Sequence, residues 1–231
     1  MIIIIIYNSS PYWHRQVSLA AILGIMIIDI AVPVLILAGL LAYQIRLTLY
    51  VRRYPLKTHQ GRTNHLRENW VKGMMKHESN VCAIQTLRNW TMAATFLAST
   101  AIIIAFGVLN LLVTAEQLPN HSAFASSAVP WVFKLIALAC NFVLAFFNFS
   151  LAIRYYNYAG FLINVPGTDE LPRSVEVAGR AVNQGARHYT LGMRHYYLSV
   201  PLVCWQFSTQ LLLWSSLLLM CMLVYMDYNT D

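Results

Sequence analysis

The residue best suited to chemistry in this sequence is a carboxylate within a long apolar segment. Asp29 lies twelve residues inside an apolar run that begins at Val17. A charged side chain at the centre of a bilayer costs about 2.5–3.5 kcal/mol on insertion scales, and such residues usually have a partner or a function. Asp29 is therefore either a proton or cation site, or a polar contact that fixes the register of neighbouring helices.

Two further polar side chains are candidate partners for Asp29 inside the membrane. Lys134 is the only basic residue in the apolar run 131–153, and Asn141 lies seven residues after it. Both side chains donate hydrogen bonds that a carboxylate accepts, so we group Asp29, Lys134 and Asn141 as a candidate intramembrane polar site. Interhelical hydrogen bonds of this kind are typically worth only about 0.6 kcal/mol, which favours a packing role for Asn141.

The sequence lacks the short motifs that mark common enzyme classes. It contains no Walker-type or Rossmann glycine pattern, no GxSxG and no HExxH. The four cysteines have no CxxC spacing, and we interpret them as small buried hydrophobic residues. His188 and His195 are seven residues apart and share a helix face, which leaves haem or metal ligation open beside a surface role. We expect no catalytic activity and no cofactor.

The composition places these residues in a membrane protein. Apolar residues make up 58% of the chain and charged residues 11%, whereas about a quarter of a soluble domain is charged. A bilayer core requires roughly 20 apolar residues of helix, and the long apolar runs exceed any plausible strand. The sequence therefore predicts an all-α membrane protein in which residues 1–231 form a single domain with four transmembrane helices, at about 17–45, 90–114, 131–153 and 198–226.

The distribution of basic residues predicts an orientation. Nine Lys and Arg residues lie between Arg46 and Arg88 and five between Arg154 and Arg194, but none lies in 115–130. Short basic loops stay in the cytoplasm, so the cytoplasmic loops are expected to be 46–89 and 154–197, with both termini outside. The net charge of +7 is concentrated beside apolar runs, which indicates contact with anionic lipid rather than with nucleic acid.

Both cytoplasmic loops contain amphipathic patterns. In the first loop, Leu66, Trp70 and Met74 recur every four residues between basic side chains, as in a helix that lies on a membrane face or against partner helices. In the second loop, Ser174 with Glu176 marks a helix start. Within the second span, small residues recur at four-residue spacing and predict a close-packed helix face; they are Ala94, Ala98, Ala101 and Ala105.

Several local strings resemble a known membrane family. They are PLKTHQG at 55–61, RENWV at 67–71, AIQTLRN at 83–89, MAATFLAST at 92–100, SLAIRYYN at 150–157 and GFLIN at 160–164. Together they resemble the uncharacterised integral membrane family catalogued as domain of unknown function 599, found in bacteria and plants. The resemblance extends from about Asp29 to Trp205 and implies an integral membrane protein with no established activity.

The resemblance also singles out polar positions at the cytoplasmic ends of the second and third spans. Besides Asp29, it points to Arg88, Asn89, Arg154 and Asn157. By the predicted topology these four lie at one membrane depth, so we expect a cluster in which the arginines bind lipid phosphate, helix-end carbonyls or a partner. Trp70 is a further candidate for lipid or partner contact.

Two functions remain open at this point. One is an accessory or structural subunit of a larger complex in the bacterial inner membrane, packed against lipids and against other subunits or further copies of itself. The other is a small oligomeric transporter or ion-conducting protein that uses Asp29 as its mid-membrane site. The absence of paired broken helices and the small number of spans favour the accessory role.

Overall fold

The described part of this protein consists almost entirely of helices. The computed structural model describes residues 31–36, 38–40, 42–47, 49–51, 53–54, 57–76, 81–116, 128–165 and 174–228. Within these ranges the chain is helical and contains no strand. After the Ala31–Val51 helix come α2 (His59–Lys76), α3 (Val81–Glu116), α5 (Ala128–Asn164), α6 (Val175–Phe207) and α7 (Thr209–Tyr228).

The predicted all-α membrane class is confirmed. Four helices are long and apolar enough to cross a bilayer: Ala31–Val51, Val81–Thr114, Trp131–Asn164 and Thr209–Asp227. The predicted second and third spans lie within α3 and α5. The first predicted span overlaps the Ala31–Val51 helix, and its remaining residues lie outside the described part of the chain.

Serine and threonine side chains cap three of the helices. Thr58 is fully buried, and its hydroxyl accepts the backbone N–H of Gly61 in the first turn of α2. Ser174 accepts the backbone N–H of Val177, as expected for the predicted helix start. Ser208 has extended backbone angles, donates its N–H to Cys204 and accepts the N–H of Leu211 through its hydroxyl. One residue thus ends α6 and begins α7.

The predicted fourth span, 198–226, is wrong as a continuous helix. Its apolar sequence runs without interruption, but Ser208 divides it between two helices that run in opposite directions. The predicted second loop, 154–197, is also mostly helix, because α5 continues to Asn164 and α6 begins at Val175. Hydropathy alone cannot detect a chain reversal that a serine cap makes within one residue.

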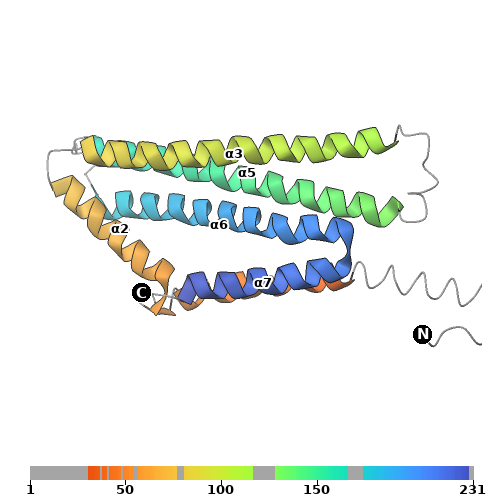
Figure 1. Ribbon diagram of the computed structural model, residues 1–231. Coiled ribbons are helices and arrows are strands. Elements are labelled where there is room, and N and C mark those ends of the chain that lie inside the picture. Colours follow the sequence, from red (N-terminus) through yellow and green to blue (C-terminus); the bar gives the residue numbers. More distant parts are fainter. Residues whose placement is uncertain are drawn as a thin grey trace, which may run out of the picture.

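Four long helices lie side by side in chain order (Figure 1). α3, α5, α6 and α7 alternate in direction, and each packs against the next. α2 crosses one end of this layer and contacts mainly α6. We call this end of the bundle the basic end. It consists of α2 and the adjoining ends of α3, α5 and α6, and it carries exposed lysines and arginines. α7 runs back toward the basic end, and the α6–α7 turn lies at the opposite end.

Two hydrophobic clusters divide the interior along the helices. The first lies between α3, α5, α6 and α7, and it contains the four predicted alanines of α3, all buried. That prediction of a close-packed face is confirmed. The second lies at the basic end and joins α2 to α3, α5 and α6. Tyr189 packs against both clusters, so the two are continuous at this residue.

α5 and α6 approach each other through glycines of α6 and aromatic rings of α5. A Cβ at Gly185 would lie 2.6 Å from the ring of Tyr156, and one at Gly192 would lie 2.8 Å from the ring of Phe149. The glycines are seven residues apart on α6, and the rings are seven residues apart on α5. Tyr189 stacks edge-on against Phe149 at 5.6 Å and completes the contact. The two helices therefore share one antiparallel register along this face.

The length of α3 and α5 exceeds the thickness of a bilayer. Each has 36 or 37 residues, which corresponds to roughly 54 Å of helix, against a hydrocarbon core of about 30 Å. The surplus of both helices adjoins α2 and the second cluster. α2 and the adjoining ends of α3, α5 and α6 therefore form a packed helical layer at the basic end.

Removing the space opposite Phe149 should destabilise the bundle. In Gly192→Ala the added methyl must displace the ring, so we expect a loss of about 1–3 kcal/mol in the free energy of unfolding. Gly107→Ala on α3 is the matched control, because no atom lies within 4 Å of its added Cβ. Thermal unfolding in detergent should show a lower Tm only for Gly192→Ala. Equal Tm values for the two variants would contradict the close approach of α5 and α6.

Candidate functional site

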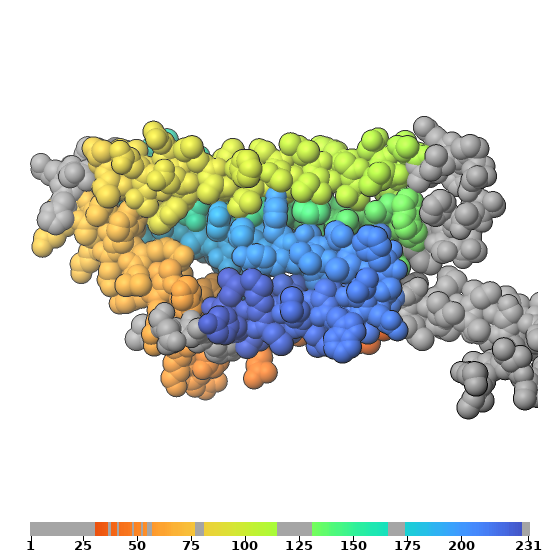
Figure 2. Space-filling view, in the orientation of Figure 1, coloured from red at the N-terminus to blue at the C-terminus, as the bar shows by residue number. Residues whose placement is uncertain are grey.

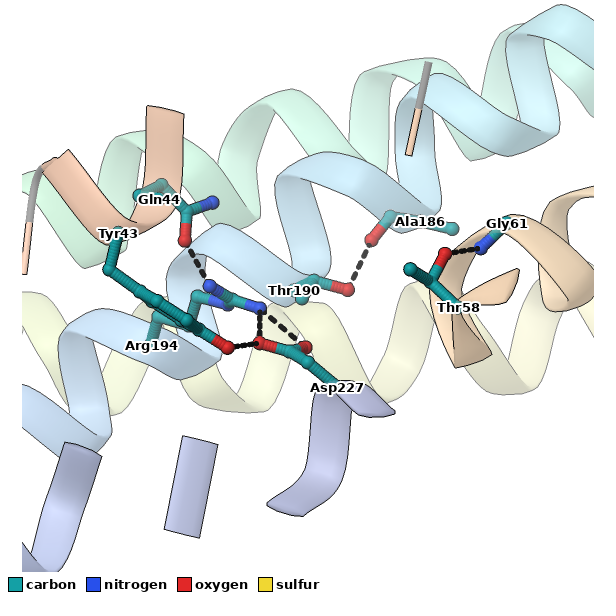
Figure 3. A network of polar contacts seen from close by, with 8 residues as sticks. All are labelled: Tyr43, Gln44, Thr58, Gly61, Ala186, Thr190, Arg194 and Asp227. Carbon is teal, nitrogen blue, oxygen red and sulfur yellow. Dashed lines mark hydrogen bonds and ion pairs between the residues drawn. The ribbon is translucent and has the colours of Figure 1, made fainter. Parts of the chain in front are cut away.

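A buried ion pair joins the end of α7 to the middle of α6 (Figure 3). One terminal nitrogen of Arg194 lies 2.7 and 2.8 Å from the two carboxylate oxygens of Asp227. Both side chains are only 12% exposed. The other terminal nitrogen of Arg194 donates to Gln44, and the hydroxyl of Tyr43 donates to Asp227 over 2.8 Å. The Ala31–Val51 helix, α6 and α7 therefore meet at one charged contact.

Each charge of this ion pair compensates the desolvation cost of the other. A buried charge that loses its partner retains its desolvation cost, whereas an intact pair with further hydrogen bonds compensates it. Asp227 has two such hydrogen-bonding neighbours besides its own helix, Arg194 and Tyr43. We therefore regard this network as the device that fixes α7 and the Ala31–Val51 helix against α6.

Two asparagine–histidine pairs lie between α5 and α6. The amide nitrogen of Asn141 donates to the backbone carbonyl of His195 at 2.8 Å, and its oxygen lies 3.0 Å from Nδ1 of the same histidine. The first bond fixes the amide orientation, so the Asn141 oxygen accepts a proton carried on Nδ1. Asn148 lies 3.2 Å from Nδ1 of His188, whose ring stacks on Tyr155. The two pairs repeat at seven residues on both helices.

A cavity of about 670 Å³ adjoins the Arg194 network and the Asn141–His195 pair. Its wall combines these polar groups with leucine, alanine and valine side chains from the Ala31–Val51 helix, α5, α6 and α7. Volumes between about 300 and 1,000 Å³ are usual for sites that hold a small molecule or a lipid chain. This cavity and its polar edge form the candidate site.

The structure describes two of the three residues of the predicted intramembrane site, and these two make different contacts. Asp29 lies outside the described residues. The ammonium of Lys134 lies 5.5 Å from the ring centroid of Trp205, a cation–π contact between α5 and α6. Asn141 is buried and bonded to His195. Of the two described residues, Asn141 borders the cavity and Lys134 does not.

The four polar residues predicted to cluster at the basic end are not joined to one another in the described part of the protein. Arg88, Asn89, Arg154 and Asn157 all have exposed side chains, and within the described chain no hydrogen bond or ion pair joins them to one another. Their contact with lipid or a partner stays a prediction. Trp70 is partly buried, with its ring centroid 5.7 Å from that of Trp90, and its contact with lipid or a partner also stays a prediction.

The basic end also contains a half-buried arginine. Arg67 of α2 donates to Asn64, and burial lowers the pKa of its guanidinium while the neighbouring Tyr156 acts in the opposite direction. Close by, the amide of Asn183 donates to Glu68 at 2.9 Å and ties α6 to α2. These contacts position α2 across the ends of the long helices.

The structure does not support the expectation of buried cysteines. All four are free, and Cys82, Cys140 and Cys221 are exposed on the helix surfaces. In the described part of the chain, no three His, Cys, Asp or Glu side chains come close enough to hold a metal ion. His188 and His195 share a face as predicted, and each pairs with an asparagine there.

Sequence reasoning missed the ion pair and most of the cavity. In the sequence, Arg194 is one of five basic residues in a predicted loop, and Asp227 lies just beyond the predicted fourth span, 198–226. One signal was present: Asn141 and Asn148 have the same seven-residue spacing as His188 and His195. Recognising that signal required knowing that α6 runs antiparallel along α5.

Replacing one partner of the ion pair should destabilise the protein more than replacing both partners with apolar residues. We expect Arg194→Ala to lower the free energy of unfolding by about 3–5 kcal/mol, because Asp227 keeps its buried charge. The double variant Arg194→Met with Asp227→Leu should recover most of this loss. Thermal unfolding in detergent measures both.

The exposed pair Arg180–Glu176 provides the matched control. Its side chains are 67% and 86% exposed, so Arg180→Ala should change the stability by less than about 1 kcal/mol. If Arg194→Ala and Arg180→Ala have the same Tm, the Arg194 network does not hold the helices together.

Comparison with known proteins gives the family of the chain. No curated protein and no solved structure matches it significantly. A family model described as "Protein of unknown function, DUF599" matches residues 30–231, which includes every helix described above. The chain therefore belongs to the DUF599 family.

Proposed function

We propose that this protein is an accessory or structural subunit of a larger complex in the bacterial inner membrane, without catalytic activity of its own. The observation that carries the proposal is that three pairs of polar side chains join different helices inside the bundle. Arg194 with Asp227, Asn141 with His195 and Asn148 with His188 are contacts of this kind. Such pairs fix the register of neighbouring helices, which is the role expected of a structural subunit.

The outer surfaces of the bundle support the same role. Figure 2 shows α3 and α7 at the two edges of one face, with α6 between them. Large apolar side chains are exposed on both edge helices, among them Phe96 and Phe106 of α3 and Trp214 and Leu218 of α7. Lipid covers such side chains in a membrane, and helices of another subunit pack on them equally well.

The alternative function is a small oligomeric transporter or ion-conducting protein that uses Asp29. Asp29 lies outside the described residues, so this alternative stands on the sequence alone. The charges of Arg194 and Asp227 neutralise each other. The accessory role is therefore the proposal that we favour.

We further propose an orientation in which the basic end faces the cytoplasm. Exposed lysines and arginines gather there, as on cytoplasmic surfaces beside an anionic leaflet; they include Arg46, Lys57, Lys72, Lys76, Arg88, Arg154, Arg180 and Arg187. In this orientation the second half of α6 crosses the membrane beside α5. α7 then ends on the cytoplasmic side, which changes the earlier expectation that the C-terminus lies outside.

Cysteine labelling in intact cells tests this orientation. In a variant without the four native cysteines, Asp231→Cys should be protected from a membrane-impermeant maleimide until the cells are lysed. Ser122→Cys, between the second and third spans, is the control and should react in intact cells. Labelling of Asp231→Cys from outside would contradict the passage of α6 across the membrane.

Co-purification tests the accessory role. The chain should be isolated in mild detergent with other membrane subunits bound, and mass spectrometry would identify them. Because Arg88 is exposed at the basic end, we expect Arg88→Ala to lower the yield of partner or bound lipid without changing Tm. Lys72→Ala removes an exposed charge on α2 and serves as the control. A chain that is isolated alone, or with further copies of itself only, would contradict a heteromeric role.

A further inference from the structure

The cavity beside Arg194 has a buried floor and an exposed rim. Leu202, Leu219 and Leu223 line its floor and are each less than a tenth exposed. Cys140 and Leu144 of α5 line the same cavity and are exposed, as is Val34 on the opposite wall. The cavity therefore opens outward between the Ala31–Val51 helix and α5.

The opening lies at the depth of the hydrocarbon core. The lining residues of α5 fall six to thirteen positions after Trp131, where its apolar span begins. At 1.5 Å per residue they lie roughly 9–20 Å into a core of about 30 Å. On α7, Leu219 and Leu223 lie in the second half of the span Thr209–Asp227. An occupant of this cavity must enter sideways from the bilayer.

One edge of the cavity supplies polar groups in an otherwise apolar wall. Arg194 has five N–H donors, and its contacts with Asp227 and Gln44 use three. His195 lines the same edge, where its Nδ1 is bonded to Asn141. An apolar chain with an oxygen-rich head matches this distribution, because the chain fills the leucine-lined part and the head accepts from the guanidinium.

We propose that this cavity binds one phospholipid, with an acyl chain between the Ala31–Val51 helix, α5 and α7. The ester or phosphate oxygens lie toward Arg194, whose charge Asp227 holds in place. The ligand enters between Val34 and Leu144, and its headgroup is directed to the basic end. The site belongs to the isolated chain and does not rest on the accessory role.

Thiol labelling of Cys140 tests the proposal, because this cysteine lines the cavity. The protein is delipidated in detergent with its other cysteines replaced by alanine, and labelled with a small maleimide. Phosphatidylglycerol should slow labelling about tenfold at nine-tenths occupancy, since the rate then follows the free fraction. A second protein that retains only Cys221, which is exposed on α7 and does not line the cavity, should change less than about twofold.

A cavity-filling variant separates this site from the lipid that coats any membrane protein. Ala38→Trp places a large ring in the cavity, whereas Ala42→Trp on the same helix changes an exposed alanine that does not line it. Native mass spectrometry should find one phospholipid retained by the parent protein and by Ala42→Trp, and none by Ala38→Trp. Equal retention by both variants would overturn the proposal. Protection of Cys140 by palmitate but not by phosphatidylglycerol would also overturn it.

Discussion

Gly185 and Gly192 bring the backbone of α6 against the aromatic rings of α5, and the rest of the bundle depends on that close approach. Because the two helices share a seven-residue register, the same contact aligns Asn141 with His195 and Asn148 with His188. The same contact places α6, which contains arginine and histidine residues, beside the apolar helix α5. The polar side chains of α6 find partners only because the glycines permit this distance.

The position of α6 determines where α7 and the Ala31–Val51 helix lie. Ser208 reverses the chain in one residue, so α7 returns along α6 and its last turn reaches Arg194. Tyr43 and Gln44 bind the same ion pair from the Ala31–Val51 helix. The cavity lies beside this contact and is lined by residues of the Ala31–Val51 helix, α5, α6 and α7.

The two hydrophobic clusters differ in composition and in the helices that they join. The cluster between α3, α5, α6 and α7 is built of alanines, leucines and aromatic rings at bilayer depth. The cluster at the basic end adds α2 and is bordered by exposed lysines and arginines. α3 and α5 contribute residues to both clusters. A partner bound at the basic end would therefore contact the same helices that form the membrane part.

The sequence by itself determined the membrane class, the apolar helices and the concentration of basic residues, because hydropathy and charge are properties of consecutive residues. It also located the alanine face of α3 and the cap at Ser174, which follow from spacing and local hydrogen bonding. Only the tertiary structure decided that 198–226 contains a reversal, that α6 lies beside α5, and that Arg194 meets Asp227. Those features join residues distant in the chain, and their energy comes from contacts that exist only after the helices have packed.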